Sequence, residues 1–298
     1  MGIPETQLET WAKQGSVTGS STTYNTVKDA LEALSTPYSG KKYSVYLQGS
    51  YGNTTNIYAE SDVDLVICLH DCFQSDRSEL TSEQETQWSS AHPGSAGYGH
   101  VEFKADVIKV LKDKFGKNVD AGNKAVFIPA SGSRRNADVI VAIDFKRYSK
   151  FNSLNDQDYV QGICFYDASN RRIVNYPKQH RENLTRRHQD SHEWVKPMIR
   201  IVKNARTKLV DGGVIEAGVA PSYCLEGLIY NAPFDCFGTN YNTSLQKVLL
   251  WMYDTEDNSK WVTANEQFYL LWDDTPMAWQ KANYAKFKNA IIELWNNW

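Results

Sequence analysis

Two aspartates one residue apart are the feature of this sequence that most directly indicates chemistry. Asp62 and Asp64 open the apolar run "DVDLVICL", which predicts a buried strand over residues 62–69. Side chains two positions apart on a strand point to the same face, so the two carboxylates would lie side by side. Because like charges repel and buried charge is costly, the pair indicates a bound divalent cation.

A third carboxylate is available from another apolar strand. Asp138 directly precedes Val-Ile-Val-Ala-Ile in a strand that we expect over residues 137–145. Mg²⁺ binds a few carboxylates together with phosphate oxygens and water. Two such ions about 3.5–4 Å apart can stabilise both the attacking and the leaving oxygen of a phosphoryl transfer. We therefore expect two Mg²⁺ ions, for which Mn²⁺ can substitute.

A Gly-Ser step, Gly49-Ser50, ends the strand predicted over residues 43–50. Glycine lets the backbone approach a triphosphate closely, and backbone amides and a serine hydroxyl can hold its oxygens. Alone, Gly-Ser is usually a turn, and Asp-x-Asp is usually a surface or calcium-type loop. Their combination with a distant third aspartate at a strand end predicts nucleotidyl transfer.

The elements that would position these residues change in character along the chain. Residues 51–61 are expected to be a polar loop, and residues 70–97 a loop or an exposed helix followed by a loop. Apolar periodicity predicts the remaining elements: strands within 43–50, 62–69, 124–130 and 137–145, a hairpin of 162–167 with 171–177, and helices over 4–14, 22–35, 100–116, 193–209, 220–233, 241–254 and 282–297. We expect one domain over residues 1–182 and a helical one over 183–298.

Composition excludes several classes of protein. The 298 residues, 41% of them hydrophobic, suffice for one large domain or two packed lobes. A net charge of −3 gives no global positive field for nucleic acid. The sequence shows no signal-peptide pattern and no apolar run near the roughly 20 residues of a membrane span. We expect a cytoplasmic protein with reduced thiols, in which Cys68 and Cys72 are small buried side chains rather than a metal-binding pair.

The motif order resembles the polymerase-β-like nucleotidyltransferase superfamily. The resemblance rests on "GSYGNTTNIYAESDVDLVI" and "ADVIVAI". Within the superfamily the chain resembles the bacterial CD-NTases, which are similar to cyclic GMP-AMP synthase and DncV. The fragments "GICFYDASNRRIVNYPKQHREN" and "APSYCLEGLIYNAP" resemble their CdnE-type branch. The resemblance covers about residues 43–235.

The resemblance implies an α+β fold and a set of metal ligands. It implies a nucleotidyltransferase core, a mixed sheet with helices, against a C-terminal helical lobe, with NTPs in the cleft between them. Asp62 and Asp64 would bridge the two Mg²⁺ ions, and Asp138 would complete one site and help to activate the attacking ribose hydroxyl. Asp144 competes for the third place. In the family, hydrophobic residues directly follow the third aspartate, and Asp138, which precedes Val-Ile-Val-Ala-Ile, matches this pattern.

The resemblance also implies contacts to the donor nucleotide. Gln48 and Ser50 would hold the triphosphate, and Lys203 and Ser222 match the lysine and serine that contact the donor phosphates. Tyr223 would stack on a base, with a packed helix tyrosine as the equally weighted alternative.

Three further polar residues remain open in role. Asn175 is the candidate for reading a base edge, uracil included, because its amide both donates and accepts hydrogen bonds. The alternative is that Asn175 only orders the turn before Tyr176. We expect His180 and His188 to be surface residues rather than ligands.

A basic segment lies within this otherwise acidic chain. Residues 171–208 hold eleven Lys and Arg against three Asp and Glu. Lys196, Arg200 and Lys203 fall on one face of the expected helix. This face would offset the negative charge of a triphosphate; the alternative is a solvated helix face.

The resemblance implies a cyclic oligonucleotide synthase that joins ATP, UTP or GTP into a second messenger. Its context would be bacterial antiphage (CBASS) signalling, with a separate effector activated by the product. The chain lacks the His and Cys insertion of the animal DNA sensor, so we expect no DNA activator. An alternative is a nucleotidyltransferase acting on RNA, protein or a small molecule. A third is a non-catalytic nucleotide-binding regulator, which the presence of all three aspartates disfavours.

Overall fold

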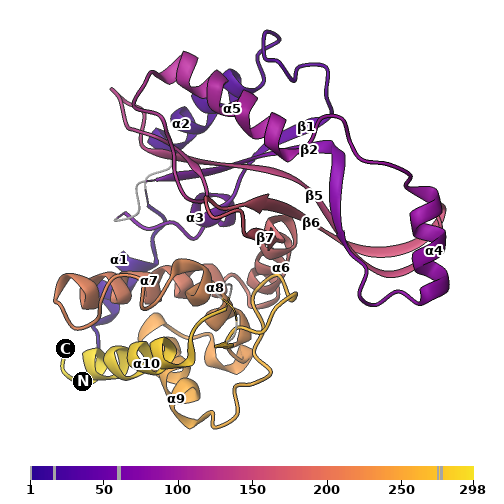
Figure 1. Cartoon of the computed structure of the whole chain (residues 1–298). Coiled ribbons are helices and arrows are strands. Elements are labelled where there is room, and N and C mark those ends of the chain that lie inside the picture. Colours follow the sequence, from indigo (N-terminus) through magenta and orange to yellow (C-terminus); the bar gives the residue numbers. More distant parts are fainter. Residues whose placement is uncertain (1, 16–17, 59–61, 274, 276–277) are drawn as a thin grey trace. The chain divides into compact units, whose positions relative to one another are not determined.

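The computed structural model describes residues 2–15, 18–58, 62–273, 275 and 278–298, which form two compact units (Figure 1). We call residues 18–48 and 61–177 the sheet unit, and residues 1–17, 49–60 and 178–298 the helical unit. The predicted α+β class, a mixed sheet with a C-terminal helical part, is confirmed. The predicted domain boundary at residues 182/183 stays a prediction. The helical unit also includes two segments from early in the chain, residues 1–17 and 49–60.

The sheet unit is built on one seven-stranded sheet among its described residues. Its strands are β1 (Tyr43–Leu47), β2 (Val63–Asp76), β3 (Asp120–Ala121), β4 (Val126–Ile128), β5 (Ala137–Ser153), β6 (Asp156–Tyr166) and β7 (Arg172–Asn175). The order is β1-β2-β5-β4-β3, and β6 pairs with β5 and β7. The central pair, β2 and β5, is parallel, and the other pairs are antiparallel. The predicted hairpin is thus confirmed as β6 and β7.

Two helices, α2 (Thr18–Leu31) and α5 (His100–Phe115), lie together beside the sheet (Figure 1). On α5, Phe103, Val107 and Leu111 recur every four residues and are fully buried, as the helical spacing predicts. Gly116 caps this helix with a φ of 91°, a left-handed conformation that glycine adopts without steric cost. The predicted stop of the helix at Gly116 is therefore confirmed.

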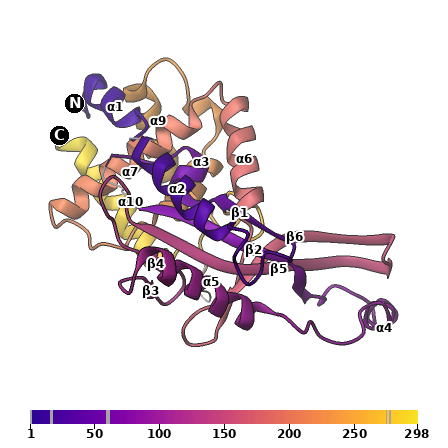
Figure 2. The same cartoon turned by 90° about the horizontal axis from the view of Figure 1, so that it is seen from above.

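β5 and β6 continue beyond the rest of the sheet as a long ribbon, with α4 (Ser82–Ala91) beside it (Figure 2). The prediction of a loop or helix over residues 70–97 is wrong for its first part, because β2 runs on to Asp76. The register of β2 against β5 shifts between Leu69 and Phe73, and a bulge of this kind lets a strand resume pairing after an irregular stretch. The rest of residues 70–97 contains helix α4 followed by a loop, which agrees with the predicted alternative of a helix followed by a loop.

The helical unit contains α1 (Glu5–Ala12), α3 (Gly49–Asn53), α6 (Pro177–Asp190), α7 (Val195–Asp211), α8 (Ser222–Asn231), a 3-10 turn at Phe234–Cys236, α9 (Tyr241–Asp254) and α10 (Lys281–Asn296). Its core gathers around α7, whose Met198, Ile199 and Val202 are buried. None of the helices in the described residues is long and apolar enough to span a membrane.

Two helices of this unit differ from the sequence prediction. Residues 51–53 were expected in a polar loop, but they belong to α3, and Asn53, Thr55 and Asn56 are buried. Two hydrogen bonds offset this burial: Asn53 Nδ2 donates to Glu226 Oε2 of α8 at 3.0 Å, and Asn56 Oδ1 accepts from Gln14 Nε2 at 2.8 Å. Helix α6 was not predicted, because its polar composition gives little apolar periodicity.

Candidate active site

The pairing of β2 with β5 brings Asp64 and Asp138 opposite each other. In this parallel pair Asp64 is the register partner of Asp138, and both side chains are partly buried. Partners on adjacent strands face the same side of a sheet, so the two carboxylates share one face. Asp62, just before β2, is exposed, and its Oδ1 accepts a hydrogen bond from Asn136 Nδ2 at 3.1 Å.

Electrostatic coupling links Asp62 to Asp138. Burial and the negative charge of Asp62 together raise the pKa of Asp138 above its ordinary value. Carboxylates that disfavour one another's ionised form are what a divalent cation would stabilise. The arrangement therefore fits the oxygen-ligand chemistry of Mg²⁺.

Asp144, the competing third carboxylate, lies elsewhere on β5. It pairs in register with Phe73, beyond the bulge of β2, and its Oδ1 is 2.9 Å from His70 Nδ1. The register thus distinguishes Asp138 from Asp144 as the partner of Asp64.

Gln48 follows β1 and lies beside Asp64. Its backbone N–H donates to the backbone oxygen of Asp64 at 3.0 Å. Its side-chain Oε1 is buried and has no hydrogen-bond partner among the described residues. Because buried acceptors are normally satisfied, this oxygen indicates a place where a ligand could donate.

The Gly-Ser step continues the chain into α3. Gly49 has a φ of 62°, in the left-handed region that favours glycine. Ser50 Oγ accepts a hydrogen bond from Lys203 Nζ at 2.7 Å, and Nζ also donates to the Thr55 backbone oxygen at 3.0 Å. The structure therefore brings together the serine and the lysine that the sequence assigned to the donor phosphates.

The basic face of α7 is packed inside the helical unit. Lys196 and Lys203 are buried, and Arg200 donates to the backbone oxygens of Ala12 at 2.5 Å and Thr54 at 2.7 Å. The alternative of a solvated helix face is therefore wrong. Burial lowers the pKa of both Lys196 and Arg200. Arg200 and Lys203 together fasten segment 49–57 to α7.

A buried acid, Glu226 of α8, was missed in the sequence. Its Oε2 accepts from Asn53 Nδ2 at 3.0 Å and from His180 Nε2 at 2.6 Å, and its Oε1 accepts from Thr55 Oγ1. Burial acts to raise the pKa of Glu226, but the hydrogen bond and charge of His180, with the charge of Lys203, hold it below its ordinary value. One acidic residue in the apolar run "LEGLIY" was the available signal.

His180 is not the surface residue that we expected. It is 3% exposed, and its Nε2 donates to Glu226 Oε2, as a buried imidazole N–H requires a hydrogen-bond acceptor. Glu226 thereby joins α6 and α8 to segment 49–57, which carries Ser50.

Comparisons with known proteins agree with this geometry. Residues 182–296 match the family model of the cGAS/DncV-like nucleotidyltransferase C-terminal helical domain. The cyclic UMP-AMP synthase of Rhodothermus marinus is 36% identical over 300 residues, which cover 100% of this chain and 99% of that protein. The chain belongs to the cGAS/DncV-like nucleotidyltransferases. The predictions of family and of a nucleotidyltransferase of the cyclic nucleotide synthase class are confirmed.

Other members of the family extend the likeness over the whole chain. The structure of the R. marinus CdnE c-UMP-AMP synthase with Apcpp and Upnpp superposes with a TM-score of 0.88 and covers 99% of this chain and 97% of that one. The Elizabethkingia meningoseptica CdnE structure with GTP and Apcpp has a TM-score of 0.78 at 27% identity, covering 99% and 98%. The cyclic dipyrimidine nucleotide synthase CdnE of Legionella pneumophila is 31% identical, covering 98% and 97%.

In this nucleotidyltransferase, Ser222 and Tyr223 begin α8. The Tyr223 ring stacks on His180 with a centroid distance of 5.1 Å, and its hydroxyl accepts from Asn265 Nδ2 at 2.9 Å. Burial raises the pKa of Tyr223 to about 12. These contacts are those of the packed-tyrosine alternative, and base stacking by Tyr223 stays a prediction.

Asn175 ends β7, and its Oδ1 accepts from the Tyr176 backbone N–H at 2.8 Å. The backbone of β6 packs closely against this turn at Gly162, where a Cβ would lie 2.7 Å from the Asn175 backbone oxygen and 2.8 Å from the Tyr176 ring. Asn175 therefore orders the turn, as the alternative expected, and its reading of a base edge stays a prediction.

His188 leads to a prediction about pH. Burial, followed by the charge of Lys196, lowers the pKa of this half-buried imidazole to about 4. In the unfolded chain His188 binds a proton near its ordinary pKa of about 6.5, whereas the folded protein keeps it neutral down to about pH 4. The free energy of unfolding is therefore highest above about pH 6.5 and falls as the pH drops towards about 4. Allowing for solvent screening, we expect this free energy to fall by about 1–2 kcal/mol.

Urea unfolding between about pH 7 and pH 4 would measure this loss. The matched variant His188→Gln should show a shallower loss on acidification by the same amount. Parallel pH profiles for the two proteins would contradict the assignment.

Proposed function

We propose that this nucleotidyltransferase joins two NTPs into a cyclic dinucleotide. Each step is the attack of a ribose hydroxyl on an α-phosphate with release of pyrophosphate. The observation that carries the proposal is the register of Asp64 with Asp138 beside Gln48. The named relatives are synthases of cyclic UMP-AMP, cyclic dipurines and cyclic dipyrimidines, so a cyclic product with two bases is the chemistry to test.

Asp62, Asp64 and Asp138 are the proposed metal ligands and catalytic carboxylates. A pair of Mg²⁺ ions, or Mn²⁺ in their place, would supply charge neutralisation at the phosphates. The Asp138 carboxylate lies opposite Asp64 on the adjacent strand, and an ionised carboxylate can accept a proton from a hydroxyl within hydrogen-bond reach. We assign Asp138 the role of drawing the proton from the attacking hydroxyl and Asp62 and Asp64 the role of positioning the α-phosphate.

The donor triphosphate is assigned to the Gly-Ser segment and its supports. Gly49 allows the backbone to approach the phosphates, and the Ser50 hydroxyl can donate to a phosphate oxygen while it accepts from Lys203. Gln48 would hold the triphosphate through the N–H groups of its side-chain amide, and its unsatisfied amide oxygen can accept from a ribose hydroxyl of the same nucleotide. Ser222, at the start of α8, adds a further hydroxyl.

Base selection is assigned to Asn175, with Tyr223 as a stacking surface. The Asn175 amide nitrogen can donate to, and its oxygen accept from, the Watson–Crick edge of uracil. A hydrogen bond to a base edge is worth about 1–3 kcal/mol of discrimination. We expect Asn175→Ala to lower kcat/KM for the preferred base about 5- to 100-fold and to leave turnover of the other NTPs nearly unchanged. Equal losses for all four NTPs would instead assign Asn175 to the turn alone.

The biological setting of the proposal is antiphage (CBASS) signalling in the bacterial cytoplasm. The product would activate a separate effector protein, and neither DNA nor a membrane is needed for synthesis. Support comes from the chain's acidic net charge, which disfavours a nucleic-acid activator.

An omission experiment tests the proposed substrates. Purified protein is incubated with Mg²⁺ and all four NTPs, and then with each NTP withheld in turn, while pyrophosphate release is followed. We expect release to collapse when UTP or ATP is withheld and to persist when CTP or GTP is withheld. Release that does not depend on any particular NTP would contradict a two-base synthase.

A further inference from the structure

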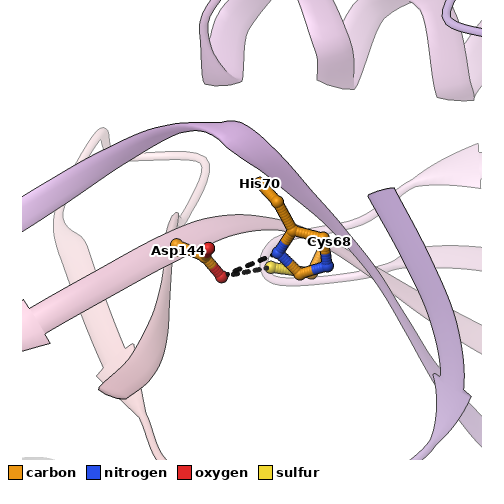
Figure 3. A group of neighbouring side chains, drawn as sticks. All are labelled: Cys68, His70 and Asp144. Carbon is orange, nitrogen blue, oxygen red and sulfur yellow. Dashed lines mark hydrogen bonds and ion pairs between the residues drawn. The ribbon is translucent and has the colours of Figure 1, made fainter. Parts of the chain in front are cut away.

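A second group of ligand-type side chains lies on the sheet, away from the aspartate pair. Cys68 and His70 of β2 meet Asp144 of β5 (Figure 3). Asp144 Oδ1 is 2.9 Å from His70 Nδ1 and 3.5 Å from Cys68 Sγ. One ligand atom from each residue lies within 4.8 Å of the others, and among the described residues this is the one group of three His, Cys, Asp or Glu that does so.

A bulge in β2 lies beside this group of side chains. His70 lies in the register shift between Leu69 and Phe73, where residues of β2 have no partner on β5. Bulges of this kind re-aim side chains and are frequent beside functional sites. The bulge directs His70 Nδ1 towards Asp144.

A further residue holds the imidazole from its other side. Ser44 Oγ of β1 is 2.9 Å from His70 Nε2. Metal-ligating histidines almost always have their second ring nitrogen held by such an outer partner, which fixes the orientation of the ring. Ser44 thus supports coordination through Nδ1.

We propose that Cys68, His70 and Asp144 form a binding site for a borderline transition metal of the Zn²⁺ class. A thiolate, an imidazole and a carboxylate are zinc ligands, whereas Mg²⁺ prefers oxygen ligands alone. Tetrahedral zinc would place sulfur and oxygen about 3.6 Å apart and nitrogen and oxygen about 3.4 Å apart. The sulfur–oxygen distance of 3.5 Å already fits.

The other two pairs of ligand atoms would have to move. The sulfur and nitrogen ligand atoms lie within 4.8 Å of each other, and tetrahedral zinc would hold them about 3.5 Å apart. The His70–Asp144 hydrogen bond at 2.9 Å would widen by about 0.5 Å as the metal replaces the proton between the two atoms. Water would take the fourth position, because His70 and Asp144 are partly exposed. Binding releases the thiol proton of Cys68 to solvent, and the imidazole proton moves from Nδ1 to Nε2, where Ser44 Oγ accepts its hydrogen bond.

The site is separate from the proposed catalytic carboxylates. Asp144 lies six residues beyond Asp138 on β5, about 20 Å along an extended strand. A metal here would join β2 to β5 at the bulge and would stabilise the sheet without taking part in catalysis. Cys68 and Cys72 are both buried, as expected, and the site pairs Cys68 with His70 rather than with Cys72.

Metal titration of the full chain, first freed of metal with EDTA, tests this site. We expect one equivalent of Zn²⁺ to bind with a Kd at or below about 1 μM, to raise the melting temperature, and Co²⁺ to give a thiolate-to-cobalt charge-transfer absorption. Cys68→Ser and Asp144→Asn should each weaken Zn²⁺ binding at least about 10-fold. Cys236→Ser removes another buried thiol, in the helical unit, and should change nothing.

Circular dichroism shows which variants are folded. If Cys68→Ser does not fold, Asp144→Asn, whose side chain has nearly the same shape as aspartate, is the variant that tests the site. Zn²⁺ binding weaker than about 100 μM, or equal binding by wild type and a folded site variant, would overturn the proposal. Because the readouts are binding and melting, neither outcome depends on the proposed synthase activity.

Discussion

Replacing Asp138 with asparagine is expected to abolish nucleotide transfer while the protein stays folded. The substitution keeps the side chain's size but removes the charge that faces Asp64 across the β2–β5 pair and that couples to Asp62. We expect kcat to fall at least about 10³-fold, as for groups that stabilise transition-state charge directly. Initial rates of pyrophosphate release under saturating NTP and Mg²⁺ measure the effect.

Asp64→Asn should have a loss of similar size, and the double variant should lose little more, because groups that act as one unit are not additive. Asp158→Asn is the matched control, since Asp158 is an exposed aspartate on β6 of the same sheet. A rate for Asp138→Asn within 10-fold of wild type would exclude Asp138 from the catalytic carboxylates.

Replacing Glu226 with alanine is expected to destabilise the helical unit severely. The change leaves His180, Asn53 and Thr55 without their shared acceptor in a site that is almost fully buried. Removing one partner of a buried, hydrogen-bonded charged group costs about 3–5 kcal/mol. We expect this loss in the free energy of unfolding, measured by urea titration at neutral pH.

Two other substitutions sharpen this prediction. Glu226→Gln keeps the shape and an acceptor oxygen, so its loss should be smaller. Glu216→Ala is the matched control, because Glu216 is an exposed glutamate of the same unit whose ion pair with Lys286 lies in solvent, and it should cost less than about 1 kcal/mol. If Glu226→Ala were as mild as Glu216→Ala, the buried network would contribute no stability.

The strands that carry the three aspartates could be predicted because an apolar run directly follows the aspartates in each. β2 and β5 begin at or beside the aspartates, and their apolar runs made both strands visible. The register could not be predicted, because it depends on which strands pair and on the bulge after Leu69. Register is what separates Asp138 from Asp144, two aspartates on one strand.

Only some of the residues that hold segment 49–57 in place could be predicted from the sequence. The resemblance assigned Ser50 and Lys203, and the structure places them 2.7 Å apart. Glu226 and His180 were not found, because their pairing joins positions 46 residues apart and leaves no local pattern. α3 was missed since its five polar and glycine-rich residues form a helix only where tertiary hydrogen bonds hold them.

The measurement that tests cyclic dinucleotide synthesis most directly is the mass of the product. Purified protein is incubated with the four NTPs and Mg²⁺, treated with phosphatase and analysed by mass spectrometry beside the Asp138→Asn variant. We predict a phosphatase-resistant species with the mass of two nucleoside monophosphates less two waters, absent from the variant. A phosphatase-sensitive linear product, or nucleotide attached to RNA or protein in its place, would contradict the assignment.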